Sequence, residues 1–134
     1  VLRVPKEPDG MITARDLTDC NVPVQRGDAV IVATGWDAHW REPDFITNCP
    51  WFSAEAMHWI LDHEPVILCG DVPRFDSWAT PQGFWDRFFG QGTLLLAPAV
   101  NLLNIDADRV KLCALPMKIE ESCAAPCRAV VVEE

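Results

Sequence analysis

Three short, continuous apolar runs constrain this chain more strongly than any other feature of its sequence. They span residues 28–34, 65–69 and 93–97. Each run is rich in β-branched or aliphatic side chains, and the first two end at Gly35 and Gly70, as buried strands often do. Between the runs, residues 54–63 and 84–89 have the pattern of short helices. This alternation of strands and helices predicts an α/β domain with a central mixed sheet.

Shorter elements complete the expected pattern. Thr13 is placed to cap a helix near residues 14–20, with Asp16 at the position of a capping-box acid. Ser53 is a similar cap for the helix that follows it. Further strands are expected at residues 1–4, 110–116 and 129–132. Two irregular stretches are expected to be loops, which often carry function, and they are residues 36–50 and 72–83.

The length and charge of the chain exclude several kinds of partner. Its 134 residues fit a single domain, residues 1–134. With 20 acidic and 11 basic side chains, the net charge is −9. Because phosphate-rich surfaces repel such a chain, we expect neither nucleic acid nor a membrane as a partner. The sequence shows no signal peptide or long apolar span, so a cytoplasmic location is expected.

The six cysteines fit buried, reduced thiols better than a disulfide framework. A chain of this length with 49% hydrophobic residues does not need covalent cross-links to fold. Cys69 and Cys113 lie inside apolar runs, where a free cysteine packs as a small hydrophobic side chain. Cys123 and Cys127 do not have the spacing of zinc ligands, and no second pair stands nearby.

Several segments, taken in order, carry a resemblance to one enzyme family. They are residues 12–17, 27–36, 53–59, 68–71, 101–102, 114–119 and 126–129, which read ITARDL, GDAVIVATGW, SAEAMHW, LCGD, NL, ALPMKI and PCRA. In this order and spacing, the chain resembles the metal-dependent cyclases that include bacterial kynurenine formamidase. The resemblance covers nearly the whole chain and implies a swivelling β/β/α domain that forms dimers or larger assemblies. It also implies a divalent metal, zinc or manganese, and hydrolysis of a small aryl or cyclic amide by metal-activated water.

The chain departs from this family at the positions that hold the metal. The family's ligand string, roughly His-x-Gly-Thr-His-x-Asp-x-Pro-x-His, does not occur in the sequence. The family has a further His of the site on a helix and a Glu twelve residues later, and aligning Gly92 and Asn101 with the family places Trp85 at that His position and Ala97 at the Glu position. The resemblance therefore implies no metal site on this chain and a domain that is incomplete at its N-terminus. The sequence starts at Val1 inside an alternating pattern typical of a strand, which fits that expectation.

Other groups of residues that could carry chemistry give weaker signals. His39 lies near Asp37 and Glu42, but their spacing matches no metal-ligand motif, so a solvated loop is the simpler interpretation. Asp71 and Asp76 could serve as paired carboxylates. A Gly-Asp pair after a buried strand more often caps the next turn through the Asp side chain, and we favour that interpretation.

Four of the six tryptophans fall in or beside the predicted loops, and they are Trp36, Trp40, Trp51 and Trp78. An aromatic side chain in a loop often lines a pocket or an interface, and local packing explains these positions about equally well. By position in the resembled family, the candidate substrate-pocket residues are Trp36, Trp85 and Ala97. An indole at Trp85 would fill space that a metal and a substrate otherwise use.

Two hypotheses for function follow. In the first, the chain is part of a metal-dependent amide hydrolase and is inactive alone, because a partner chain or a further segment supplies the metal ligands. In the second, it is a degenerate family member that acts as a subunit, scaffold or binding protein, because Trp85 and Ala97 cannot bind a metal. In both cases we expect a homo-oligomer or a complex with the segment that supplies the N-terminal part.

Overall fold

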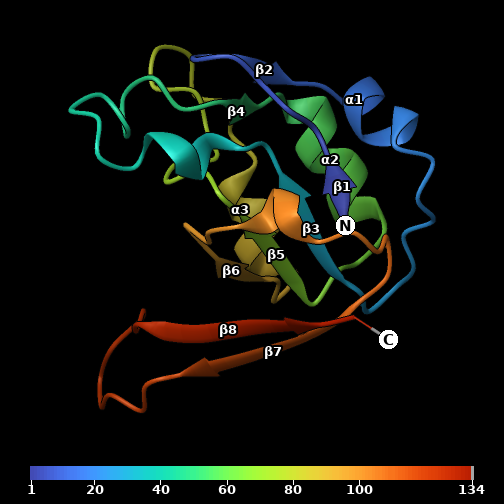
Figure 1. Cartoon of the computed structure of the whole chain (residues 1–134), viewed down its shortest axis with the longest axis vertical. Coiled ribbons are helices and arrows are strands. Elements are labelled where there is room, and N and C mark those ends of the chain that lie inside the picture. The colour runs from blue at the N-terminus through green and yellow to red at the C-terminus, as the bar shows by residue number, and fades with distance from the viewer. Residues whose placement is uncertain (134) are drawn as a thin grey trace.

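Four parallel strands form the central sheet of the computed structural model, which describes residues 1–133 (Figure 1). The strand order is β1-β3-β5-β6, and every pairing within the sheet is parallel. The members are β1 (Leu2–Arg3), β3 (Ala29–Ala33), β5 (Ile67–Gly70) and β6 (Leu94–Leu96). The three apolar runs are therefore neighbouring strands, and the α/β class is confirmed.

The prediction of a mixed central sheet is wrong, because the antiparallel strands form a separate sheet. β7 (Lys111–Pro116) and β8 (Cys127–Val132) pair with each other as a two-stranded hairpin. Leu102 and Ile105, which lead toward β7, pack on one face of the central sheet beside Cys69. The hairpin therefore lies over a face of the central sheet, and neither β7 nor β8 pairs with a strand of that sheet.

Three helices cover the opposite face of the sheet. They are α1 (Ala14–Asp19), α2 (Ala54–Asp62) and α3 (Trp85–Gly90). Thr13 and Asp16 form the expected capping box at the start of α1. Ser53 Oγ accepts a hydrogen bond from Ala56 N at 3.1 Å and so caps α2. Within residues 1–133, none of the helices has the length and apolar character needed to cross a membrane.

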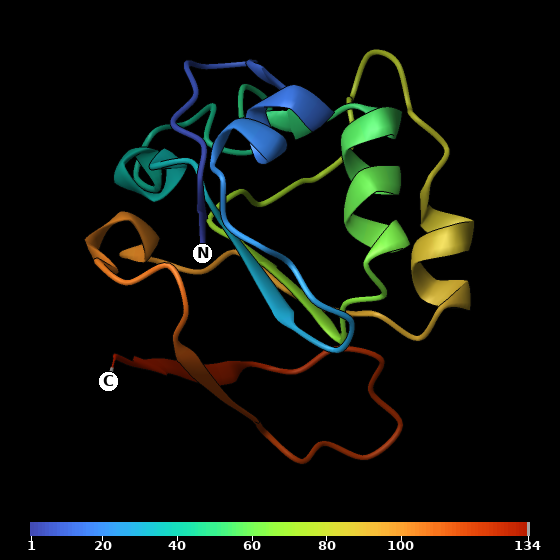
Figure 2. The ribbon, with the colours of Figure 1, turned by 90° about the vertical axis from the view of Figure 1, so that its right-hand side faces the viewer.

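Side-chain alternation along β3 divides the hydrophobic core into two parts. Val30 and Val32 belong to the cluster that contains the helices, whereas Ile31 and Ala33 belong to the cluster on the hairpin side. Figure 2 shows the resulting layers, with α2 and α3 on one side of the central sheet and the hairpin on the other. Because both of its faces are covered, β3 is almost wholly apolar, as its sequence suggested.

Residues 36–50 contain more order than the prediction of a loop allowed. The stretch begins with a 3-10 helix, Trp36–His39. β4 (Trp51–Phe52) starts directly after residue 50. β4 pairs in parallel with β2 (Met11–Ile12). Each of these strands has only two residues, which is too short for an alternating pattern to predict. A second 3-10 helix spans Leu102–Asn104.

Two arginines tie the segment before β7 to the central sheet. Arg3 donates to the backbone oxygens of Ile105 and Asp106 at 2.7 Å and pairs with Asp108 at 2.6 Å. Arg109 pairs with Asp28, next to the start of β3, at 2.8 Å. These contacts fix the point from which the hairpin departs.

Candidate functional site

A buried carboxylate joins the carboxyl ends of β3 and β5. Asp71 follows β5 and is fully buried. Its carboxylate oxygens accept hydrogen bonds from Thr34 N at 2.9 and 3.0 Å, from Thr34 Oγ1 at 2.7 Å and from Gly35 N at 2.7 Å. Burial raises the pKa of the Asp71 carboxyl, while the hydrogen bonds from Thr34 and Gly35 oppose that rise. Asp71 therefore caps the turn that follows β3, so the prediction that it caps the turn after its own strand is wrong.

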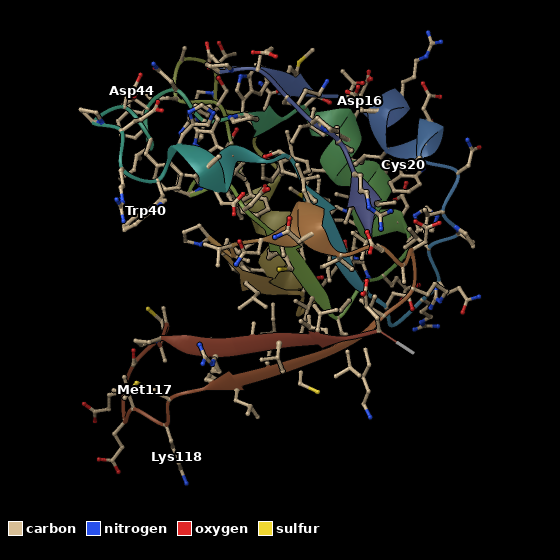
Figure 3. All side chains as sticks on the ribbon, in the orientation of Figure 1. Asp16, Cys20, Trp40, Asp44, Met117 and Lys118 are labelled. Atoms are coloured by element: carbon tan, nitrogen blue, oxygen red, sulfur yellow. The ribbon has the colours of Figure 1, made fainter. Side chains whose placement is uncertain are left out.

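The turn that Asp71 holds forms one wall of an open hollow at this edge of the sheet. Asp37 Oδ2 accepts a hydrogen bond from Asn101 N at 2.7 Å, which connects the turn after β3 to the segment after β6. The hollow is lined mainly by Gly35, Asp37, Trp40, Val100, Asn101 and Leu103. Trp40 is 61% exposed, and Figure 3 shows it at the outer end of its loop. In open α/β sheets, ligands bind outside the carboxyl ends of the strands, so this edge is the candidate site.

A second cavity of about 350 Å³ lies between the central sheet and the hairpin. Its walls are mostly apolar, and Val100 and Asn101 line it together with the hollow at the carboxyl edge. Its volume falls at the lower end of the range of small-molecule pockets. The two spaces therefore adjoin along one short segment that follows β6.

The three predicted pocket residues lie in different environments. Trp36 is buried, and its indole Nε1 donates to Phe45 O at 2.8 Å. Trp85 is half-buried at the start of α3 and stacks on Phe89. Ala97 is exposed, directly after β6. None of these three residues lines the hollow or the cavity. Residues next to Trp36 line the hollow, and residues next to Ala97 line the cavity. Contact of these three with a substrate stays a prediction.

The other tryptophans in or beside the predicted loops differ in how much of each side chain is exposed. Trp51 is half-buried in β4, whereas Trp78 is 70% exposed. The guanidinium groups of Arg41 and Arg74 lie over the rings of Trp40 and Trp78, at 4.9 and 5.7 Å from the ring centroids. Trp40 is thus the exposed indole that lies at the candidate site.

The donor groups of the described residues do not fit a divalent metal. Among residues 1–133, no three His, Cys, Asp or Glu side chains lie together in a way that could hold an ion. His39 Nδ1 instead contacts Glu42 Oε1 at 2.9 Å, and Asp37 is engaged by Asn101. The indole of Trp85 and the methyl group of Ala97 provide no ligand. The metal that the family resemblance implies would therefore need ligands from elsewhere.

Thr34 and Asn101 are site residues that sequence reasoning missed. The signal for Thr34 was present, since Thr34 ends one predicted strand, Gly70-Asp71 follow the next, and the ends of parallel strands share an edge. Asn101 has no comparable signal. Its backbone lies in the left-handed region with φ of +61°, and the contact with Asp37 depends on packing between distant segments.

All six cysteines have free thiols. Cys69 is buried, as predicted, but Cys113 is only half-buried because it lies on the hairpin and not in the central sheet. Burial raises the pKa of the Cys69 thiol to about 12. Cys123 is exposed in the turn between β7 and β8.

We expect Cys69 to resist alkylation by iodoacetamide at mildly alkaline pH while Cys123 reacts. The thiolate is the attacking species, and a thiol with a pKa of about 12 is almost entirely protonated under these conditions. Peptide mass spectrometry after brief labelling of the folded protein measures both rates, and labelling in guanidinium shows that both peptides are detected. Equal labelling of Cys69 and Cys123 in the folded protein would contradict the buried position.

The Cyclase model, described as "Putative cyclase", matches residues 1–77, which is more than half of the chain. No curated protein matches the sequence.

Three solved structures are similar to this one along almost the whole chain. An isatin hydrolase bound to the product analogue thioisatinate has a TM-score of 0.82 and 22% identity over 95% of this chain. Isatin hydrolase A from Ralstonia solanacearum has a TM-score of 0.81 and 18% identity over 96%. A potential metal-dependent hydrolase with cyclase activity has a TM-score of 0.77 and 19% identity over 96%.

The chain covers less than two thirds of the length of each of these structures. This chain spans 54%, 55% and 61% of the isatin hydrolase, isatin hydrolase A and the potential metal-dependent hydrolase, respectively. At these identities the likeness concerns the fold.

Proposed function

Because this chain belongs to the Cyclase family, whose model matches residues 1–77, we propose that it forms one portion of a metal-dependent hydrolase of small aryl or cyclic amides. In this proposal the divalent ion, zinc or manganese, is bound by residues outside 1–134, and the chain alone is inactive. The swivelling β/β/α arrangement that the resemblance implies agrees with the three layers of hairpin, sheet and helices.

The hollow at the carboxyl edge is the observation that carries this proposal. Asp37 holds Asn101, and Asp71 holds the turn that contains Gly35, so the wall of the hollow is fixed by hydrogen bonds before any ligand binds. The exposed indole of Trp40 offers a flat apolar surface for an aryl ring. The side-chain amide of Asn101 can donate to and accept from an amide substrate. These residues would bind and orient the substrate.

No proton transfer or metal step is assigned to this chain. When bound, a divalent ion would polarise the substrate carbonyl and activate water. Residues 1–133 contain no set of ligands that fits such an ion, and Trp85 and Ala97 stand at the family positions of the helix His and of the Glu that follows it.

The protein purified at its natural length from its source provides the test. Intact mass gives the length of the polypeptide, elemental analysis gives its metal content, and ring opening of isatin, a cyclic amide, gives its activity. We expect metal and chelator-sensitive hydrolysis in the natural protein and neither in residues 1–134 alone. Amide hydrolysis by residues 1–134 that survives chelation would overturn the proposal.

Trp85 and Ala97 favour a second candidate, a family member that binds without catalysis. Supplying the missing ligand string would still leave these two positions without donors. Trp85→His combined with Ala97→Glu, made in the natural-length protein, separates the two candidates. If the natural protein is inactive and the double variant gains metal-dependent hydrolysis, these two losses silenced the site. If the natural protein is active and the double variant changes nothing, the non-catalytic candidate is excluded.

A further inference from the structure

The cavity of about 350 Å³ between the central sheet and the hairpin has an apolar wall on the side of the sheet. Ile31, Cys69 and Leu96 form this wall, one from each of three neighbouring strands. Their backbones are in register, because Cys69 pairs with Ile31 on one side and with Leu96 on the other. The buried thiol of Cys69 packs as a small apolar group. This wall is therefore flat and carries no charge.

Small side chains of the hairpin form the opposite wall and leave the space unfilled. Val131, Ala129 and Cys127 alternate along β8, so they share the face of the hairpin that is turned toward the sheet. Val131 packs against the hydrophobic cluster on the sheet. Ala129 and Cys127 also line the cavity, but their side chains are smaller. Large side chains on both inner faces of two packed sheets would interdigitate and fill this layer, which the methyl group of Ala129 cannot do.

The cavity is bounded on a third side and is open toward the tip of the hairpin. Residues 98–102, which follow β6, line the third side. Figure 3 shows Met117 and Lys118 at the far end of the hairpin, away from the central sheet, so the hairpin continues past the wall of the sheet. Ala129 is exposed although it faces the sheet, and Cys127 is half-buried. A small molecule can therefore enter without separating the hairpin from the sheet.

The charge of the lining limits the chemistry of a ligand. Among the described residues that line the cavity, Arg128 is the only one with a charged side chain. Arg128 is exposed, and the alternation along β8 directs its side chain to the face of the hairpin turned away from the sheet. A charged ligand would thus lose its hydration without gaining a partner of opposite charge. An uncharged apolar ligand would gain contacts in a space that water fills poorly.

We propose that this cavity is a binding site for an uncharged, planar aromatic molecule. Both long walls are β-structure, so the space between them is a flat layer, which a ring fills better than a branched aliphatic group does. The site is distinct from the hollow that carries the proposed function, because Trp40 lines the hollow and does not line the cavity. The inference does not depend on hydrolase activity.

Titration of residues 1–134 with toluene, followed by proton–nitrogen NMR spectra, tests the proposal. We expect saturable binding with a Kd below about 1 mM and shifted signals from residues of the cavity. Benzoate, which has the same ring and a negative charge, should bind at least about tenfold more weakly. Toluene should also slow the alkylation of Cys127 by iodoacetamide. It should leave the alkylation of Cys123 unchanged, because Cys123 is exposed and does not line the cavity.

Filling the cavity from the hairpin should abolish the site. Ala129→Phe should weaken toluene binding by about tenfold or more, because its ring occupies the same layer. Ala124→Phe is the matched control, since Ala124 lies in the exposed connection of the same hairpin and does not line the cavity. Ala124→Phe and Trp40→Ala should both leave the affinity unchanged. Circular dichroism shows whether each variant is folded, and Cys127→Phe decides if Ala129→Phe does not fold.

Four results would overturn the proposal. The first is the absence of saturable toluene binding, which would mean that polypeptide and not a small molecule fills this space. The second is an affinity that the folded filling variants do not change. The third is equal affinity for toluene and benzoate. The fourth is loss of binding in Trp40→Ala, which would place the ligand in the hollow. None of these results bears on the proposed hydrolase function, because no hydrolysis is measured.

Discussion

Replacing Asp71 with leucine should lower the free energy of unfolding at neutral pH by about 3–5 kcal/mol. The substitution keeps the approximate volume of the side chain but removes every acceptor from a fully buried position. Three donors would lose their partner, namely Thr34 N–H, Thr34 O–H and Gly35 N–H. Each buried donor without an acceptor costs about 1–3 kcal/mol, and partial relaxation of the turn reduces the sum.

The raised pKa of Asp71 gives this prediction a second, pH-dependent part. Because the pKa is higher in the folded protein than its ordinary value of 3.8, the folded state binds the proton more tightly. The corresponding stability is fully present below the unfolded pKa and is lost as the pH rises through the folded pKa. The difference between wild type and Asp71→Leu should therefore grow as the pH is lowered toward about 4.

Denaturant unfolding at several pH values measures both parts of the Asp71 prediction. Asp86→Asn is a suitable control, because Asp86 is an exposed carboxylate on α3 and its loss should change stability little at any pH. A loss from Asp71→Leu no larger than that of the control would contradict the role of Asp71 as the link between β3 and β5.

Truncating Trp36 to alanine should cost a similar amount, about 3–5 kcal/mol. The side chain is 2% exposed, and its ring lies against His39 and Phe45, with centroid distances of 4.5 and 6.3 Å. Removing it leaves a large cavity beside the turn that Asp71 holds, and Phe45 O loses its donor. A domain of this size is stable by only about 5–15 kcal/mol, so the variant should approach the limit of folding.

Trp40→Ala is the matched control, because it removes the same side chain four residues later. Trp40 is 61% exposed, and we expect its loss to change stability by less than about 0.5 kcal/mol. Trp36→Phe should fall between the two, since it keeps an aromatic ring but lacks the indole N–H. Thermal and denaturant unfolding of the three variants provide the measurement. Equal losses for Trp36→Ala and Trp40→Ala would show that Trp36 does not support the core.

These two residues show how far the candidate site could be predicted. Trp36 was predicted to be a candidate pocket residue, with local packing as the alternative, and the structure shows its side chain buried. No sequence pattern distinguishes a loop tryptophan that packs inward from one that faces a ligand. Asp71 was expected to cap the next turn, but the donors to its carboxylate lie 36 and 37 residues earlier in the chain. The family resemblance, confirmed by the Cyclase model over residues 1–77, supplied the reaction that we propose, and it came from segment order, not from the chemistry of single residues.

The sequence by itself determined the class of the domain and the elements of its layers. Apolar runs, helical spacing and caps such as Thr13 with Asp16 are local signals, because they depend on the backbone and on neighbouring side chains. Tertiary structure alone decided that the central sheet is parallel, that the hairpin lies on one face of it, and that Asn101 meets Asp37. Strand order and contacts between distant segments depend on which surfaces pack together, and a local sequence pattern does not specify that packing.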